Sequence, residues 1–538
     1  WEIRNRLIIA PVSFLFQPEK IPLFNTTRPY TDLYYKLGSK QQQEIEILHT
    51  QNITPVWNIA ADYRKSGSPG FYRQQKSNHD QAWLSSNYHS VHDKYHFTFI
   101  ATYNKLQQDE NGGIESEDYL RDVRYNDRRL IPVRFEAMSS VANRSSYKNY
   151  FREARLLIQH AILIKRFGKV NLQQLQLEHQ LNASFQRFYS KDLQPDSLTY
   201  SFTQAVNFSS GDSNYFNYYF RSWGNMLSLK YQRTIADALW LLKTGAGVDR
   251  DELLANERRI NYTNPFMEFS LMNRSERRNA WNYQFTARSY FQGNLRGNNQ
   301  IRVQGKKEFP GMLGQFAWQY QHVVHTMAFT QQWYESNYLN LTTEGKKESV
   351  QEVSLFYQLA NEWFSLRASQ YRIHQFIYRD SQLIIRNADK NIALTQCEAG
   401  SHLHWRGLHS DSKLLFQYQK EAGPLHLPQW ALKTALYIQG RVVQSKLHIC
   451  SGASLRYRSA FQADEYQPVF YGFSTQYNRT IAQSPALGFF FNWQVKSFRG
   501  TISAEEIQQL FSVNRVLYPS YAAPNFNLHF GFHWSFVN

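Results

Sequence analysis

The chain has 538 residues and a net charge of +17; 16% of its residues are aromatic, only 19% are charged and 2 are cysteine. This cysteine content excludes a disulfide-rich scaffold, and no stretch reaches the roughly 18 apolar residues that a membrane-spanning helix needs. The basic residues occur as isolated pairs such as Arg128-Arg129, so no nucleic-acid partner is expected. A long chain with many aromatic residues and low hydropathy is typical of a transmembrane β-barrel.

Residues 1–24 are the least regular part of the chain. Two short apolar runs, 7–10 and 14–16, lie on either side of Pro11. Proline cannot donate to a strand ladder, so a central strand is not expected here. We expect this segment to enter the lumen, to lie in the periplasm or to extend the first strand, and we expect the barrel to comprise residues 25–538.

Further along the chain, apolar and polar residues alternate with a period of 2. Such alternation predicts strands with one apolar face and one polar face. In chain order, the clearest internal examples are residues 57–63, 95–103, 281–287, 414–418 and 487–495. The alternation slips in residues 149–175 and 298–335, which leaves their strand boundaries ambiguous.

The last segment shows the alternation best. Its apolar positions are Phe526, Leu528, Phe530, Phe532, Trp534 and Phe536. A run of this length fits a membrane-spanning strand of roughly 9–11 residues. A soluble sandwich or propeller is the alternative, but sandwich strands are shorter and the blade repeat of about 40–50 residues is not present.

The connections between these segments alternate between short and long. Short turns are expected near 52–55, 89–93, 234–237, 361–362 and 479–485, and long external loops near 107–147, 190–222 and 504–524. Outer-membrane barrels have short periplasmic turns, longer external loops and an even number of strands. We therefore predict an all-β, antiparallel, up-and-down transmembrane barrel in a bacterial outer membrane, with about 22 strands (18–22).

Residues 25–114 carry specific motifs. They include NTTRPYTDL at 25–33, HTQNITP at 49–55 and YNKLQQDENGGI at 103–114. These residues resemble the opening of the putative porin family of Bacteroidetes outer membranes, and the rest of the chain is similar in style. The resemblance implies an outer-membrane barrel described as a pore, and it supplies no catalytic residues.

The polar face of each strand is expected to line the lumen. The cations assigned to this face are Lys36, Arg64, Lys230, Arg288, Lys433, Arg441, Arg456, Arg458 and Lys496. The inward acids are fewer, namely Asp32, Asp62 and Glu398. Because Arg and Lys in a pore favour anions, the set predicts a mild anion preference. The alternative is that these cations pair with carboxylates of loops, of a plug or of neighbouring strands.

No cofactor, metal or enzyme activity is expected. Two histidine pairs share a strand face: His402 with His404, and His529 with His533. A zinc site needs further ligands at a set spacing, and none is evident. No Gly-x-Ser-x-Gly element or outward Ser-His grouping points to a lipid-cleaving barrel.

The two cysteines are predicted to be free thiols. Cys397 falls on the outward register and Cys450 on the inward register. Side chains on opposite faces of a sheet cannot reach the geometry of a disulfide.

Two functions remain. The first is passive diffusion of small polar solutes, with the wide lumen narrowed by the loop 107–147 or by the N-terminal segment. The second is a plugged barrel that serves as a structural subunit of a larger outer-membrane complex. The Tyr and Phe content of residues 190–222 and 504–524 suggests this second function, since exposed aromatic patches mark interfaces. The expected partners are outer-membrane lipid and lipopolysaccharide, small polar solutes and, for the second function, other outer-membrane proteins.

Overall fold

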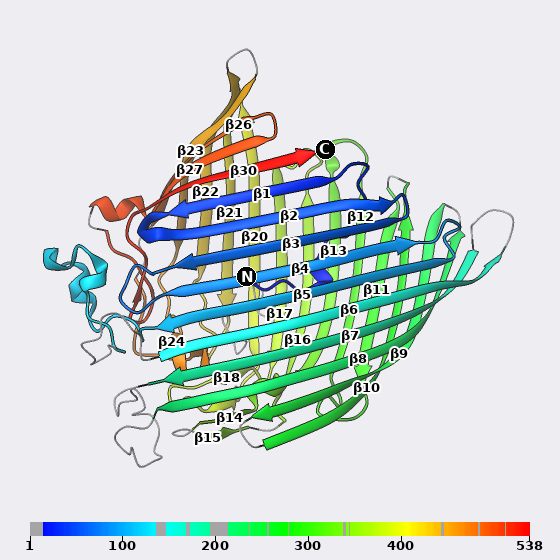
Figure 1. Cartoon of the computed structure of the whole chain (residues 1–538), viewed down its shortest axis with the longest axis horizontal. Coiled ribbons are helices and arrows are strands. Elements are labelled where there is room, and N and C mark those ends of the chain that lie inside the picture. Colours follow the sequence, from blue (N-terminus) through cyan, green and yellow to red (C-terminus); the bar gives the residue numbers. More distant parts are fainter. Residues whose placement is uncertain are drawn as a thin grey trace.

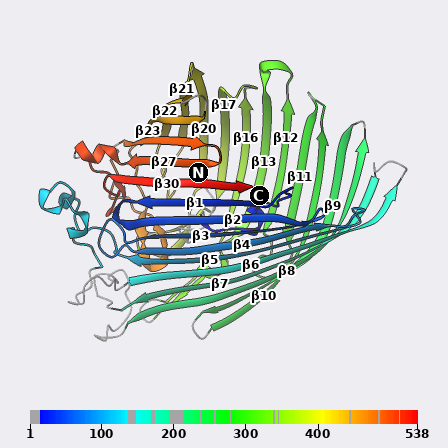
Figure 2. The same ribbon diagram turned by 45° about the horizontal axis from the view of Figure 1, so that its top comes forward.

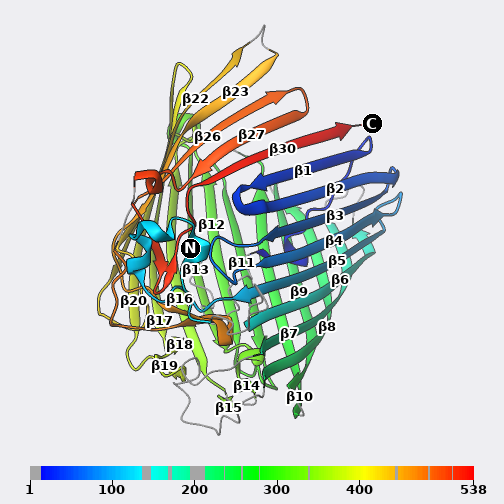
Figure 3. The same ribbon diagram turned by 60° about the vertical axis from the view of Figure 1, so that its left-hand side comes forward.

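The protein forms one closed antiparallel barrel of 22 strands (Figure 1). The computed structural model describes residues 14–135, 147–167, 173–193, 213–235, 237–255, 258–277, 279–336, 340–343, 345–442, 446–482, 485–511 and 513–537. Figure 3 shows the last strand beside the first, where the pairing of β30 with β1 closes the sheet. The predicted fold class and strand number are confirmed. No helix among the described residues is long and apolar enough to cross a membrane.

The barrel strands follow the chain order around the wall. They are β1 (Tyr30–Gly38), β2 (Gln42–Thr54), β3 (Trp57–Ser68), β4 (Ser77–His89), β5 (Tyr95–Glu110), β6 (Tyr147–Phe167), β7 (Gln173–Asp192), β8 (Asn214–Ile235), β9 (Ala238–Ala255), β10 (Arg258–Ser275), β11 (Trp281–Tyr290), β12 (Asn299–Glu308), β13 (Gln315–Thr326), β16 (Lys347–Gln358), β17 (Phe364–His374), β20 (Ile392–Trp405), β21 (Leu408–Gln419), β22 (Trp430–Val442), β23 (Leu447–Arg458), β26 (Ala486–Val495), β27 (Phe498–Glu505) and β30 (Asn527–Val537). Strands β6 to β8 have 20 to 22 residues, whereas β26 and β27 have 10 and 8. The wall is therefore uneven in height, as Figure 2 shows.

Small elements lie in the long connections and in the N-terminal segment. The two-stranded ribbons are β14 (Trp333–Glu335) with β15 (Asn340–Thr342), β18 (Ile377–Arg379) with β19 (Ile385–Asn387), β24 (Glu465–Gln467) with β25 (Gly472–Ser474), and β28 (Val516–Tyr518) with β29 (Tyr521–Ala522). The 3-10 turns used below are η2 (Pro18–Lys20), η4 (Glu117–Leu120), η5 (Val123–Tyr125), η6 (Arg128–Leu130) and η10 (Ile507–Phe511).

The two faces of the wall follow the alternation of the sequence. On β30, Leu528 and Phe530 are exposed on the outer face, whereas Asn527 and His529 are buried on the inner face. Residues directly opposite each other in neighbouring strands share a face. The register of each pair therefore assigns the remaining inward and outward positions, and an apolar outer face is what a lipid environment requires.

The two ends of the barrel carry different connections. At one end the turns are short, as between β2 and β3 or between β26 and β27. At the other end lie long connections whose described parts include residues 111–135, 327–336, 459–482, 506–511 and 513–526, and several of these gather at the left of Figure 1. Long connections are external in outer-membrane barrels, so this end faces outward from the cell.

Three sequence predictions about the connections need correction. Residues 479–485 are not a short turn but the end of the long connection 459–485, which folds back as the ribbon of β24 and β25. Residues 214–222 belong to β8, because their alternating aromatic residues form a strand that extends beyond the apolar band. The strand β5 continues to Glu110, so the loop expected from residue 107 begins at 111.

Candidate functional site: the lumen and its inner lining

The N-terminal segment lies along the inner wall of the barrel. The Phe16 backbone N–H donates to Asn104 Oδ1 at 2.9 Å, and Asn104 Nδ2 donates to the Phe16 carbonyl at 3.0 Å. Gln81 Nε2 donates to the Phe14 carbonyl at 2.6 Å, and Phe24 stacks on Trp83. These contacts hold residues 14–24 against the inward face of β4 and β5. Residues 1–13 lie outside the described residues.

A buried polar group fixes this attachment. Glu153 on β6 is only 1% exposed and accepts hydrogen bonds from Asn104 at 3.3 Å, from Arg155 at 2.7 Å and from Gln186 at 2.7 Å. A buried carboxylate is tolerated only when it is paired and hydrogen-bonded. The arrangement therefore orients Asn104 toward the N-terminal segment.

An apolar cluster fills the same side of the lumen near the external end. It joins Leu15 to inward aromatic residues of β6 to β8, and to residues of the connections that contain β14 and β25. Its members include Leu15, Phe151, Phe188, Phe216, Tyr218, Trp333, Tyr334, Val469 and Tyr471. Phe216 and Tyr218, which the sequence placed in an exposed aromatic loop, are buried in this cluster because β8 turns them inward.

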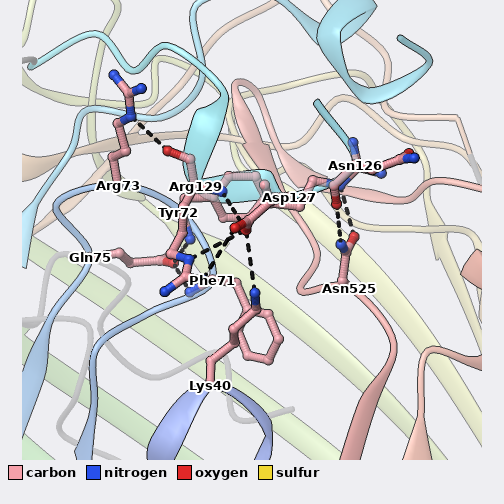
Figure 4. A network of polar contacts seen from close by, with 10 residues as sticks. Lys40, Phe71, Tyr72, Arg73, Gln75, Asn126, Asp127, Arg129 and Asn525 are labelled. Carbon is pink, nitrogen blue, oxygen red and sulfur yellow. Dashed lines mark hydrogen bonds and ion pairs between the residues drawn. The ribbon is translucent and has the colours of Figure 1, made fainter. Parts of the chain in front are cut away.

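The described part of the loop 107–147 is tied to three other external connections (Figure 4). Lys40 Nζ lies 3.3 Å from Asp127 Oδ1, and Arg73 Nε donates to the Arg129 carbonyl at 2.6 Å. The buried Arg128 donates through Nε to Asn525 Oδ1 at 2.8 Å. The hydrogen bonds from Arg129, together with the ion pair to Lys40, lower the pKa of Asp127 to about 2. The turns η4, η5 and η6 are thus held at the external end.

Several of the predicted pore-lining cations are neutralised by carboxylates of neighbouring strands. Arg64 pairs with Glu46 at 2.7 Å and lies over the Phe16 ring, and Arg288 pairs with Glu268. Lys230 lies 3.2 Å from Glu178, which also pairs with Lys243 at 2.9 Å. The lumen is therefore less basic along these strands than the count of cations suggests.

The other predicted cations differ in their surroundings. Arg458 donates to the Leu517 carbonyl at 2.9 Å and is held by the connection 506–526. Lys496 lies in the turn between β26 and β27 with a φ of 52°, so it is not on a strand face as the alternation had suggested. Lys36 lies opposite Glu44 and Gly531, and Arg441 lies opposite His448.

Three exposed cations form a row across neighbouring strands. Lys413 on β21 lies opposite Lys433 on β22, which in turn lies opposite Arg456 on β23. All three are exposed, and within the described part of the chain none of them makes an ion pair. Because Leu414 and Phe416 are exposed on the outer face, this row points inward. Lys413 was not among the predicted pore-lining cations, although it lies an even number of positions from the inward Gln417 and therefore on the same face of the strand.

The inward histidines make local polar contacts. His402 contacts Asp411, which also accepts a hydrogen bond from Tyr437 at 3.1 Å, and His409 stacks on Tyr437. On β30, His533 lies 2.6 Å from Asp32. No group of three or more His, Cys, Asp or Glu side chains in the described chain could hold a metal ion.

The structure also gives the positions of the acids and thiols that the sequence assigned to one face or the other. Asp62 is buried on β3, and Glu398 lies opposite Arg367 and Leu415. Both cysteines are free: Cys397 lies opposite Phe416 on the outer face, and Cys450 lies opposite Asn492 on the inner face.

Comparison with known families supplies the identity of this barrel. A family model described as "Putative porin" matches residues 7–538. The chain belongs to this family. No protein among curated sequences matches this porin.

Solved structures share the porin's fold at low sequence identity. The copper transporter OprC has a TM-score of 0.66 and 9% identity, with 96% of this chain and 81% of that chain covered. The siderophore receptor PirA from Acinetobacter baumannii has a TM-score of 0.64 and 8% identity, with 96% and 81% covered. P. aeruginosa FpvA, solved with bound pyoverdines, has a TM-score of 0.62 and 10% identity, with 96% and 72% covered. Family and fold together show an outer-membrane β-barrel transporter in a bacterial outer membrane.

Proposed function

We propose that the porin is a narrowed diffusion pathway for small polar solutes, with a mild preference for anions. The observation that carries the proposal is the row of Lys413, Lys433 and Arg456 on the inward face of β21 to β23. Passive passage needs a solvated wall, and these side chains are solvated.

The two sides of the lumen differ in solvation. On β5 and β6, the inward Asn104 and Glu153 are 0% and 1% exposed, because the N-terminal segment and the apolar cluster cover them. On β21 to β23 the inward Lys413, Lys433 and Arg456 remain exposed. Like charges directly opposite each other in a sheet repel, so the row favours solvent and mobile anions beside it. We therefore place the pathway along β21 to β23.

The charge on this wall sets the expected selectivity. Unpaired Lys and Arg side chains at a constriction favour anions, and clefts of one charge sign raise the local concentration of counter-ions. The preference is mild because Arg64, Lys230 and Arg288 are already paired with carboxylates. Small carboxylates and phosphates are the solute class that this row favours.

The selectivity is tested by the reversal potential of the purified barrel in a planar bilayer with asymmetric KCl. We expect an anion-selective potential that shifts toward cation selectivity in the double variant Lys433→Gln with Arg456→Gln. The matched control, Lys433→Arg with Arg456→Lys, keeps both charges and should keep the potential. An equal shift in both double variants, or none in either, contradicts the proposed pathway.

A second candidate function is a plugged subunit of an outer-membrane complex. The observation in its favour is the pair Leu510 and Phe511 on η10, which are 61% and 75% exposed on an external connection. If a partner binds there, Leu510→Ser with Phe511→Ser should remove a co-purifying protein from the native membrane while the barrel stays folded. A Bacteroidetes source, which the resemblance of residues 25–114 implies, stays a prediction.

A further inference from the structure

The outer face of β5 to β8 changes abruptly from apolar to basic near the external end. The outward positions are mainly apolar over residues 95–103 of β5, 154–164 of β6, 175–185 of β7 and 223–231 of β8. The next outward position toward the long connections is a cation in every case, namely Lys105, Arg152, Arg187 and Arg221. An apolar run of about 10 residues spans the membrane core. These cations therefore lie at the boundary of the outer leaflet.

The row of cations on β5 to β8 is not repeated on β21, β22, β23 and β26. At the equivalent outward positions, β21, β22, β23 and β26 carry Tyr418, Trp430, Tyr457 and Leu487. Aromatic and apolar residues at this level are the common pattern of outer-membrane barrels. The basic sector on β5 to β8 departs from that pattern and points to a local ligand of opposite charge.

A shallow depression of about 220 Å³ lies within this basic sector. Its outward lining side chains are Tyr103, Arg152, Phe185, Arg187, Tyr219 and Arg221. A second hollow of about 160 Å³ continues from Tyr219 and Arg221 to Arg259 and also contains Glu252, which lies 3.8 Å from Arg221 and 2.6 Å from Arg259. Because Glu252 neutralises Arg221, the depression offers the guanidinium groups of Arg152 and Arg187 between aromatic walls at the level where lipid headgroups lie.

Arg152 at the centre of the sector has no counter-ion among the residues that the structure describes. It lies directly opposite Lys105 on one side and Arg187 on the other. Lys105 is neutralised by Asp80 at 3.1 Å, and Arg187 lies 4.9 Å over the Tyr219 ring. Arg152 itself makes no ion pair with any residue that the structure describes, because the neighbouring Glu153 points into the lumen. Like charges in direct cross-strand contact destabilise a sheet unless an anion lies between them.

We propose that this depression binds the phosphate group of an anionic lipid of the outer leaflet. Arg152 and Arg187 donate to the phosphate oxygens, and the planar guanidinium group suits such bidentate contacts. Tyr103 and Phe185, both about 40% exposed, lie on the membrane side of the two arginines and pack against the lipid below its headgroup. The location on the lipid-facing surface favours a lipid phosphate over a free anion.

The test uses diphosphoryl lipid A added to the delipidated, full-length barrel in detergent, with bound lipid counted by native mass spectrometry. We expect Arg152→Gln with Arg187→Gln to weaken binding by at least about tenfold, because two charge-assisted contacts to phosphate are lost. The control, Lys165→Gln with Arg233→Gln, removes two outward cations at the short-turn end of β6 and β8 and should change binding by less than about twofold. Arg152→Lys with Arg187→Lys, which keeps the charge, should restore part of the affinity.

Three results overturn the proposal. Equal weakening in the two Gln double variants shows a general effect of net charge. Equal binding of dephosphorylated lipid A shows that the acyl chains alone carry the affinity. Full competition by millimolar inorganic phosphate shows an anion site that does not select a lipid. The heat-dependent gel mobility of each variant reports folding. If Arg152→Gln with Arg187→Gln misfolds, Arg152→Lys with Arg187→Lys still tests the proposal, because it keeps both charges and should bind lipid A more weakly than the native barrel.

Discussion

At the scale of single residues, the lumen is organised by a few buried polar side chains. Glu153 is the centre of the group that reaches Asn104, Arg155 and Gln186, and it is almost fully buried. Removing one partner of a buried charged group leaves the other partners without compensation, which costs more than losing an exposed ion pair. This difference makes Glu153 a residue that stabilises the wall and the attachment of the N-terminal segment together.

We therefore expect Glu153→Ala to lower the free energy of unfolding by about 3 kcal/mol. The control is Glu421→Ala, which removes an exposed partner of Lys390 and should cost less than about 1 kcal/mol. Urea unfolding of the two variants in lipid vesicles, followed by tryptophan fluorescence, measures the difference. Equal losses of stability would contradict the role given to Glu153.

At the scale of elements, the N-terminal segment and the external connections occupy the barrel. Asn104 makes two hydrogen bonds to the Phe16 backbone, so it attaches the segment to β5. Asp127 joins the connection 111–135 to Lys40, while Arg128 joins it to the connection 506–526. Each attachment consists of few contacts, so a single substitution tests it.

Asn104→Ala should release the segment from the wall and raise the single-channel conductance, by about 1.5-fold or more if the segment narrows the pathway. Thr102→Ala is the matched control, since Thr102 lies on the same inward face of β5 and its hydroxyl has no hydrogen-bond partner among the described residues. Unchanged conductance in Asn104→Ala, with the segment more sensitive to protease, would show that the segment does not narrow the pathway.

The contact of Asp127 should depend on pH. Its pKa is about 2 in the folded protein, below the usual value of about 3.9. The contact therefore stabilises the connection fully above about pH 4 and is lost as the pH falls through 2. At pH 4, pepsin should cleave residues 111–135 more slowly in the native protein than in Asp127→Asn. The difference should shrink as the pH falls to 2, where about half of the Asp127 carboxyl is protonated. A difference as large at pH 2 as at pH 4 would contradict this assignment.

At the scale of the whole molecule, the alternation of the sequence predicts the barrel but not its interior. The clean alternation of β30 and β5 follows directly from a wall with a lipid face and a polar face. The alternation slips in β6 because of a bulge between Leu163 and Lys165, which shifts the faces by one position. A bulge cannot be predicted from periodicity alone, since it depends on the pairing with β7.

The candidate site was predictable only in part for a related reason. The parity of Lys433 and Arg456 places them on one face, but their alignment with Lys413 depends on the register between strands. The carboxylates that neutralise Arg64 and Lys230 also come from neighbouring strands through that register. The burial of Phe216 and Tyr218 depends on long connections that fold into the lumen, and no local pattern encodes that contact.

The single-channel current of the purified, unmodified barrel in a planar bilayer tests the diffusion pathway most directly. A diffusion pathway along β21 to β23 predicts steady open steps with an anion-selective reversal potential in asymmetric salt. A barrel that inserts and stays folded but remains silent would contradict the diffusion pathway and would favour a plugged subunit.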